Sequence, residues 1–376
     1  MAHLRALVAF PSVSSAPNRD LVAWLADRLE DAGARVEVLA APCGAKANLW
    51  ASFGPDAPGG LVLSGHTDVV PVEGQDWTRP PFALTEEDGR LYGRGTCDMK
   101  GFVAACLAAV ADGGAARRRT PLHLAFTYDE EVGCLGGRAL TADLAARGIR
   151  PGLVVVGEPT GMAVVDGHKG CCEYTVRFTG LAGHGSDPGA GANAVEAAAR
   201  YAARLIALRP RLAAAAPADE RFQPPWTTLN VGALHGGAAH NVIAEEARLD
   251  WEMRPVRAAD ADLVRTEMAA CAAELLAEMH SIHPGAAIET EVVGEVAGLD
   301  PRPANAARDL LCGLTGQNGA GTVPFGTEAG LYQALGADVA VCGPGHIAQA
   351  HTADEYLAVD QLGACCTLLR RLVAAA

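Results

Sequence analysis

Short apolar runs alternate with amphipathic segments through the first part of the chain. Leu21, Leu25 and Leu29 recur at helical spacing, which predicts a helix over residues 18–32. Similar patterns predict helices at residues 99–111 and 135–146, and strands at residues 36–39, 48–53, 60–64, 122–128 and 153–156. Because strands that alternate with helices build sheets with helices on both faces, we expect an α/β domain with a mostly parallel mixed sheet.

The pattern changes after about residue 170, where polar and apolar residues alternate along the strands as in half-exposed sheets. Strands and two long helices are predicted at residues 173–178, 192–208, 227–234, 247–253, 262–279 and 288–293. This β-α-β-β-α-β order indicates a small two-layer α+β unit. The first pattern returns from Pro303 onward, with helices at 304–315 and 360–374 and a strand at 337–342. We therefore expect an α/β domain that is interrupted by an inserted unit.

Composition and charge narrow the class of protein. The chain of 376 residues carries a formal net charge of −14, which repels nucleic-acid phosphates and anionic lipid surfaces, so we expect neither as a partner. No run of about 18 apolar residues indicates a membrane span, and the first residues do not resemble a secretion signal. The 11 cysteines form no Cys-x-x-Cys pair, which favours free thiols in a reducing, cytoplasmic compartment.

Acidic and histidine side chains follow several of the predicted strands, near the point where each strand ends. These residues are His66, Asp68, Glu130, Glu131, Glu158 and, farther from its strand, His351. The carboxyl ends of the strands in an open α/β sheet meet in one crevice, so side chains that are distant in sequence converge there. Asp98 lies in a glycine-rich stretch just before the helix at 99–111 and can reach the same edge.

This group of two imidazoles and several carboxylates predicts a metal site. Carboxylates that cluster without cations repel one another, and divalent cations remove the repulsion. Mixed histidine and carboxylate ligands suit zinc, cobalt or manganese better than calcium or magnesium. The number of ligands favours two cations bridged by one carboxylate, for which Asp98 is the candidate. Asp68 is placed to hold the imidazole of His66 in one tautomer.

The neighbouring acids Glu130 and Glu131 predict two different roles. Adjacent side chains at a strand end point in different directions, so one can bind a metal while the other faces the water between the metals. The second acid would act as the general base that activates this water and returns the proton to the leaving amine. The residues alone leave open which acid has which role.

Other chemistries fit the sequence poorly. The glycine-rich loop at residues 180–191 lacks the Gly-Lys-Ser/Thr of a phosphate-binding loop, and Ser186 within it is not framed as Gly-x-Ser-x-Gly. No Gly-x-Gly-x-x-Gly opens a helix after the first strand, which argues against a dinucleotide site.

Five motifs in this order resemble the M20 metallopeptidase and deacylase family, and they extend over nearly the whole chain. They are Ser64–Pro71, Gly93–Phe102, Tyr128–Gly133, Gly157–Thr160 and His351. The resemblance implies two metal ions that share Asp98 as a ligand. The first ion would also be held by His66 and Glu158, and the second by Glu131 and His351.

The same resemblance assigns the position of the general base to Glu130 and implies a cis peptide bond after Asp98. It also implies that residues 1–169 and 298–376 form a catalytic metal-binding domain. Residues 170–297 would form a lid domain through which the protein dimerises with a second copy of itself.

Three residues of the expected lid match functional positions of the family. His184, in Gly183–Ser186, matches a histidine that reaches across the dimer and stabilises the oxyanion in the partner's active site. Asn241 and Arg254 match positions that bind the substrate carboxylate, a task that suits the fork of an arginine.

Within the family, the segments Phe325–Gly330 and Gly343–Glu355 look most like those of acetylornithine deacetylases, although His346 stands where we expect a small residue. We therefore expect the deacetylation of N-acetyl-L-ornithine, a step of arginine biosynthesis, with zinc or alternatively cobalt as the metal. Glu328 would accept the ammonium group of the ornithine side chain. The same chemistry on succinyl-diaminopimelate, acetylcitrulline or a dipeptide stays open, as does a non-catalytic protein that binds a metal or ligand.

Overall fold

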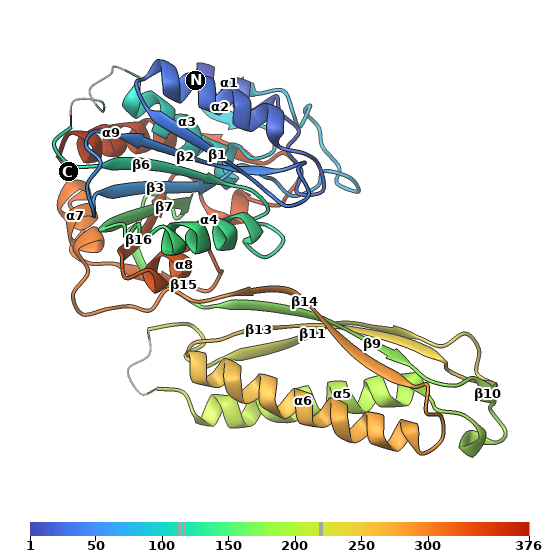
Figure 1. Ribbon diagram of the computed structural model, residues 1–376. Helices are drawn as coiled ribbons and strands as arrows, with labels where there is room; N and C mark the ends of the chain where they lie inside the picture. Colours follow the sequence, from blue (N-terminus) through green and yellow to red (C-terminus); the bar gives the residue numbers. More distant parts are fainter. Residues whose placement is uncertain (112–114, 116–117, 218–220, 376) are drawn as a thin grey trace. The chain divides into compact units, whose positions relative to one another are not determined.

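The computed structural model describes residues 1–111, 115, 118–217 and 221–375, which form two compact units (Figure 1). Unit 1 consists of Met1–His168, Leu299–Thr322 and Thr327–Ala376. Unit 2 consists of Lys169–Gly298 and Val323–Gly326, and it therefore interrupts unit 1 in the sequence.

Unit 1 is built around an eight-stranded mixed sheet. In spatial order, its strands are β1 (Arg35–Ala40), β2 (Ala47–Phe53), β6 (Leu122–Thr127), β3 (Leu61–His66), β7 (Leu153–Pro159), β16 (Asp338–Gly343), β8 (Val165–His168) and β15 (Gly321–Val323). The central strands β6, β3, β7 and β16 are parallel, whereas β1, β2 and β8 pair antiparallel to their neighbours. The expected α/β class with a mixed sheet is confirmed, and the parallel strands form its centre.

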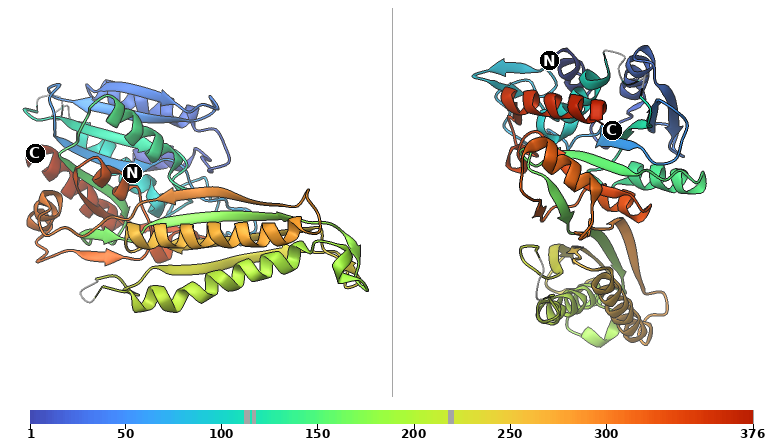
Figure 2. Two further views of the ribbon diagram at one scale, coloured as in Figure 1. Left: turned by 60° about the horizontal axis from the view of Figure 1, so that its bottom comes forward. Right: turned by 90° about the vertical axis from the view of Figure 1, so that its left-hand side faces the viewer.

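Helices cover both faces of this sheet (Figures 1 and 2). Because side chains alternate along a strand, Leu61 and Leu63 of β3 join the core on one face and Val62 points to the other. The first core also contains residues of α1 (Ala2–Val8), α2 (Arg19–Asp31), α3 (Gly101–Val110), α7 (Ala306–Thr315) and α9 (Val359–Ala375). The other face is covered by α4 (Leu135–Ala146) and α8 (Ala329–Ala334). Both faces of the central strands are therefore buried.

A second, three-stranded sheet of unit 1 is not predicted by the sequence. It consists of β4 (Thr85–Glu87), β5 (Arg90–Tyr92) and β17 (Tyr356–Ala358). Strands of three residues are too short to show a hydrophobic period. The short helices α1 and α8, of 7 and 6 residues, were not predicted for the same reason. The pairing of β17 with β5 matters for function, because it ties the segment after His351 to the segment before Asp98.

Unit 2 is a two-layer structure (Figures 1 and 2). Its antiparallel sheet has the order β11 (Thr228–Gly236), β13 (Glu246–Arg254), β9 (Cys171–Thr179) and β14 (Ala287–Val296). Helices α5 (Ala194–Ala214) and α6 (Ala258–His280) cover one face and enclose a core that includes Phe178 and Leu249. Two short strands, β10 (Gly183–His184) and β12 (Val242–Ile243), pair with each other beside this sheet. Across the described parts of both units, no helix combines the length and apolar character needed to span a bilayer.

Candidate metal centre

His66 is the last residue of β3, and its side chain is almost completely buried. Its Nδ1 atom lies 2.9 Å from the backbone oxygen of Asp68 and 3.5 Å from the Oδ1 atom of the same residue. The Nε2 atom faces Oδ1 of Asp98 at 3.0 Å and Oε1 of Glu158 at 3.9 Å. An imidazole that donates through Nδ1 keeps Nε2 free to bind a metal.

Asp98 lies in the irregular turn η1 (Thr96–Lys100) ahead of α3, and the peptide bond that follows it is cis, as the resemblance implies. The buried carboxylate of Glu355 holds this turn. It accepts hydrogen bonds from the backbone N–H groups of Cys97 and Asp98 at 2.9 and 3.1 Å and pairs with the buried Arg94 at 2.8 Å. Glu355 therefore fixes the direction in which the carboxylate of Asp98 points.

The two carboxylate oxygens of Asp98 face two different imidazoles. Oδ1 lies 3.0 Å from Nε2 of His66, and Oδ2 lies 3.3 Å from Nε2 of His351. The same nitrogen of His351 lies 3.0 Å from Oε2 of Glu131. The side chain of His351 is 50% exposed, whereas that of Asp98 is 7% exposed, so His351 marks the open side of the cluster. A carboxylate between two imidazoles has the arrangement expected of a bridging ligand.

Glu158 lies within strand β7, because parallel pairing with β16 continues as far as Pro159. The expectation that Glu158 follows the end of this strand is therefore wrong. The longer strand still brings its buried side chain to the same place. Ligand atoms of His66, Glu130 and Glu158 lie within 4.8 Å of one another, and so do those of His66, Asp98 and Glu131. The side chains that the sequence indicated as ligands thus meet at one edge of the sheet.

Glu130 and Glu131 lie in the connection between β6 and α4. We call this connection, together with the first three residues of α4, the base segment (residues 128–137). Its backbone adopts positive φ angles at Asp129 (54°), Gly133 (104°) and Cys134 (53°). Non-glycine residues in this conformation cost free energy, so neighbouring contacts must hold them in place.

Asp68 supplies part of that support. Its carboxylate accepts the backbone N–H groups of Glu130 at 3.1 Å and Glu131 at 3.3 Å, and the hydroxyl group of Ser14 at 2.7 Å. Asp68 thus orients the two glutamates through its side chain, and it approaches His66 more closely through its backbone oxygen than through its carboxylate. The sequence predicted only the contact with His66.

The electrostatics of the cluster reflect an excess of negative charge. Burial, reinforced by the neighbouring carboxylates, raises the pKa of Glu130 and Glu158 well above their usual range and that of Glu131 to about 7. Hydrogen bonds to Asp98 and Glu131 raise the pKa of His351 to about 10. Cations among these groups would compensate the repulsion and the desolvation that produce the shifts. The donor set therefore fits two divalent cations with mixed nitrogen and oxygen ligands.

Unit 2 contains the other residues with predicted roles. His184 and Asn241 are exposed neighbours, because β10 pairs with β12 and the N–H group of Gly185 donates to the backbone oxygen of Asn241 at 2.8 Å. Arg254 ends strand β13 and pairs with Glu252 at 2.7 Å. His184 and Asn241 lie near the other end of β13, where the strand begins at Glu246. The strand is about 26 Å long, at about 3.3 Å per residue. One copy of unit 2 therefore cannot bring Asn241 and Arg254 to the same carboxylate.

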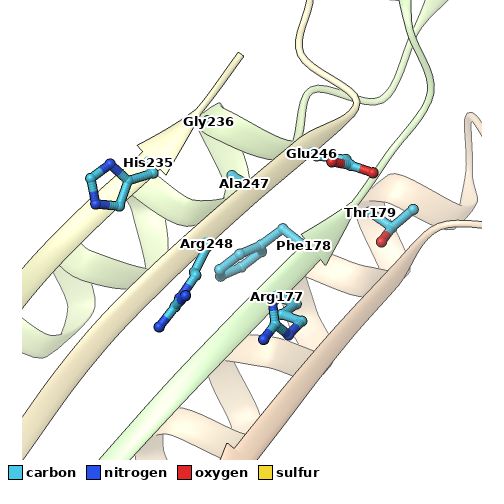
Figure 3. Close-up of a pocket in the computed structure, with 8 residues that line it drawn as sticks. All are labelled: Arg177, Phe178, Thr179, His235, Gly236, Glu246, Ala247 and Arg248. Carbon is cyan, nitrogen blue, oxygen red and sulfur yellow. The ribbon is translucent and has the colours of Figure 1, made fainter.

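Unit 2 also has a surface pocket of about 330 Å³ that contains none of the predicted site residues (Figure 3). His235, Arg248 and Arg177 lie abreast on three neighbouring strands of its sheet. Both arginines are already paired with acidic side chains, Arg248 with Asp250 at 2.9 Å and Arg177 with Glu291 at 3.5 Å. This pocket offers no cluster of ligands comparable to that of unit 1.

Glu328 does not lie where a substrate can contact it. The residue is 1% exposed, and both of its carboxylate oxygens are buried. The predicted contact with the ammonium group of a substrate is therefore not supported. His346, by contrast, is exposed, and its ring lies so close to Gly161 that a Cβ atom there would come within 2.2 Å of it.

Sequence reasoning missed three residues that hold the site in place. They are Glu355, Arg94 and Lys46, whose ammonium group contacts the carboxylate of Asp129 at 2.5 Å in the base segment. Glu355 and Arg94 lie inside the motifs Gly343–Glu355 and Gly93–Phe102 that carry the resemblance. An acidic residue in one motif and an arginine in the other can form a buried ion pair, and this is the signal that the sequence offered.

Comparison with known proteins supports this description of the fold. A tripeptidase from Staphylococcus aureus is 20% identical, with a TM-score of 0.74 over 99% of this chain and 96% of the other. An M20 family metallo-carboxypeptidase from Sulfolobus solfataricus is 16% identical, with a TM-score of 0.78 over 98% and 97%. A dinuclear metal-binding peptidase from Bacillus subtilis is 16% identical, with a TM-score of 0.66 over 99% and 95%. These likenesses show the shared fold. Residues 62–375 match the model of peptidase family M20/M25/M40, so the chain belongs to this family of metal-dependent hydrolases.

Proposed function

We propose that the protein hydrolyses the amide bond of a small N-acylated amino acid, with N-acetyl-L-ornithine as the first substrate to test. The observation that supports this chemistry is the carboxylate of Asp98, whose two oxygens face His66 and His351 at 3.0 and 3.3 Å. Glu130 lies beside this bridge without being one of the proposed ligands.

Two divalent cations, zinc or alternatively cobalt, would bind to His66, Asp98, Glu131, Glu158 and His351, with Asp98 shared between them. When bound, such cations polarise an acyl oxygen and lower the pKa of water. Asp68 keeps Nε2 of His66 directed at the cations by holding its Nδ1 atom. The buried Glu355 prevents Asp98 from turning away, because it accepts hydrogen bonds from the consecutive backbone N–H groups of Cys97 and Asp98.

Glu130 is the proposed general base. It would take a proton from the attacking water and deliver it to the nitrogen of the leaving amine. A base works best when its pKa is close to the working pH, and burial raises the pKa of Glu130 in that direction. The hydrogen bond from its backbone N–H group to Asp68 fixes the residue for this transfer.

We further propose that the protein acts as a homodimer in which each active site uses residues of both subunits. Arg254 would bind the substrate carboxylate, and Asn241 and His184 would be supplied by the partner subunit. The support for this division is the length of strand β13, which separates Arg254 from the other two residues within one copy of unit 2. His184 would stabilise the oxyanion that forms on the acyl carbon.

Mixed dimers test this division. We expect the variants H184A and E130Q to be almost inactive by themselves, because each lacks one essential group in both active sites. A mixed dimer contains one complete site, composed of the metal ligands and Glu130 of the H184A subunit and the His184 of the E130Q subunit. Mixing the variants under conditions that exchange subunits is expected to restore up to about a quarter of the wild-type activity.

The matched control is a mixture of E130Q with the double variant H184A/E130Q, which contains no complete site and should stay inactive. Failure of the first mixture to gain activity, although subunit exchange is demonstrated with labelled protein, would contradict the shared site.

A dipeptide is the second candidate substrate, because proteins of the same fold are described as a tripeptidase and a carboxypeptidase. The burial of Glu328 also means that this residue does not select a cationic side chain. We expect the zinc-loaded protein to turn over N-acetyl-L-ornithine faster than succinyl-diaminopimelate, acetylcitrulline or a dipeptide. Steady-state kcat/KM values for the four compounds decide between them.

The variant R254K serves as the internal control for this panel. We expect it to raise KM about tenfold or more for the substrate with a free carboxylate, since an ammonium cannot replace a bidentate guanidinium. A matched analogue with a carboxamide in place of the carboxylate should be insensitive to the substitution. Purified protein that neither binds zinc nor hydrolyses any of these compounds would support the non-catalytic alternative.

A further inference from the structure

The carboxyl group of Glu328 is buried without a partner in unit 1. Glu328 directly precedes α8 and is 1% exposed, and neither carboxylate oxygen makes a hydrogen bond with any residue that the structure describes. Buried polar groups are nearly always paired, so an unpaired carboxyl group requires an explanation. Its distance from solvent argues against contact with a substrate.

One side of this carboxyl group lies against the base segment. A Cβ atom at Gly137 would lie 2.5 Å from Oε1 and 2.8 Å from Cδ of Glu328. Gly137 belongs to the first turn of α4 and is the last residue of the base segment. The absence of a side chain at this position is what allows the carboxyl group to reach the helix backbone.

The other side of the carboxyl group faces the two strands that lead into the metal centre. The hydroxyl groups of Thr127 and Ser64 lie close enough to lower the pKa of Glu328, although neither makes a hydrogen bond of normal geometry with it. Thr127 is the last residue of β6, directly before the base segment, and Ser64 precedes His66 by two residues on β3. Ser64 also bonds to the hydroxyl group of Tyr332 at 2.9 Å. Glu328 thus fills the space between α4 and the ends of two central strands.

The burial of Glu328 favours its neutral form. Burial raises its pKa to about 7, and the charge of Asp68 reinforces this effect while His66 opposes it. The charge of Glu328 would in turn raise the pKa of Glu130 and of the thiol of Cys134, the acidic groups of the base segment that face it. Among the described residues, Glu328 forms no ion pair that would compensate a negative charge.

We infer that Glu328 is a positioning residue that fills the space between Gly137 and the ends of β3 and β6 and thereby holds the base segment in its strained conformation. This inference rests on the proposed role of Glu130 as the general base. Positive φ angles at two non-glycine positions of the segment, Asp129 and Cys134, mean that it would relax if its support were removed. A shift of about 1 Å in a catalytic group costs on the order of 100-fold in rate.

Two substitutions of Glu328 separate its shape from its charge. We expect E328A to lower kcat about 100-fold while KM stays within about twofold of the wild type, because the base moves. The proposed ligand Glu131 lies in the same segment, so the assay is run with zinc in excess. E328Q keeps the shape and neutrality of the protonated acid, and it should retain at least about a third of kcat. Amide hydrogen exchange in residues 128–137 should become faster in E328A and stay unchanged in E328Q.

A rescue experiment tests the contact with Gly137. The added methyl group in G137A collides with the carboxyl group, so kcat should fall about as far as in E328A. The double variant G137A/E328D withdraws the carboxyl group by one methylene, and we expect it to recover at least about tenfold over G137A. V339A, which truncates a buried residue of β16 outside the base segment, controls for a general loss of stability and should keep kcat and the exchange pattern of residues 128–137.

Two results would overturn the inference. One is an E328Q variant whose kcat is as low, and whose amide hydrogen exchange in residues 128–137 is as fast, as in E328A. This result would show that the charge of Glu328 matters rather than its shape. The other is a double variant no better than G137A. Wild-type protein without amide hydrolase activity would contradict the proposed function instead. The exchange measurements would then still decide whether Glu328 holds the base segment.

Discussion

Replacing Glu130 by glutamine is expected to lower kcat by about 10²–10⁴-fold while both metal ions stay bound. The amide of glutamine cannot take a proton from water at neutral pH, so the attacking group and the leaving amine both lose their proton carrier. The hydrogen bond from the backbone N–H group of residue 130 to Asp68 does not depend on the side chain, so the base segment should keep its shape. Steady-state kinetics together with metal analysis of the purified variant measure both parts of this prediction.

The matched control is E86Q, which neutralises an exposed acid on β4 in the same unit and should behave as the wild type. A Glu130 variant with more than about a tenth of the wild-type kcat would show that another group carries the proton. A variant that has lost its metals would show instead that Glu130 is a ligand, a possibility raised by its position within 4.8 Å of His66 and Glu158.

Replacing Asp98 by alanine is expected to reduce bound zinc from two ions to fewer than one per chain and to abolish turnover. The two oxygens of Asp98 face the two imidazoles, so loss of this proposed bridge removes a ligand from each cation at once. Removal of the metals from the wild type with a chelator should have the same effect on activity. Zinc or cobalt should restore the chelated wild type but not the D98A variant, as measured by turnover and by metal content after dialysis.

A second acidic cluster makes a useful control for this experiment. Ligand atoms of Cys171, Glu173 and Glu252 lie within 4.8 Å of one another in unit 2 and could retain zinc adventitiously. The variant E173Q should therefore keep two zinc ions and full activity, whereas H351A should lose one ion. A D98A variant that still binds two ions and turns over substrate would contradict the bridging role.

The sequence predicted the long elements well, because their hydrophobic periods are repeated several times. The helix expected at residues 135–146 has those bounds in the structure, and the second long helix of unit 2 differs only at its ends. The three-residue strands β4, β5 and β17 were not foreseen, since a period cannot be read from three positions. These short strands nevertheless tie the chain after His351 to the chain before Asp98.

The types of the proposed ligands and their placement near the ends of central strands could be read from the sequence alone. A parallel sheet gathers the carboxyl ends of its strands, so strand-end residues such as His66 and Glu131 converge whatever the details of packing. Only the tertiary structure decided how these residues are held. The carboxylate of Asp68 accepts a hydrogen bond from the backbone of the base segment, and the carboxylate of Glu355 accepts one from the backbone N–H group of Asp98. It also decided that Glu328 is buried, because burial depends on segments that approach from distant parts of the chain and leave no periodic trace in the local sequence.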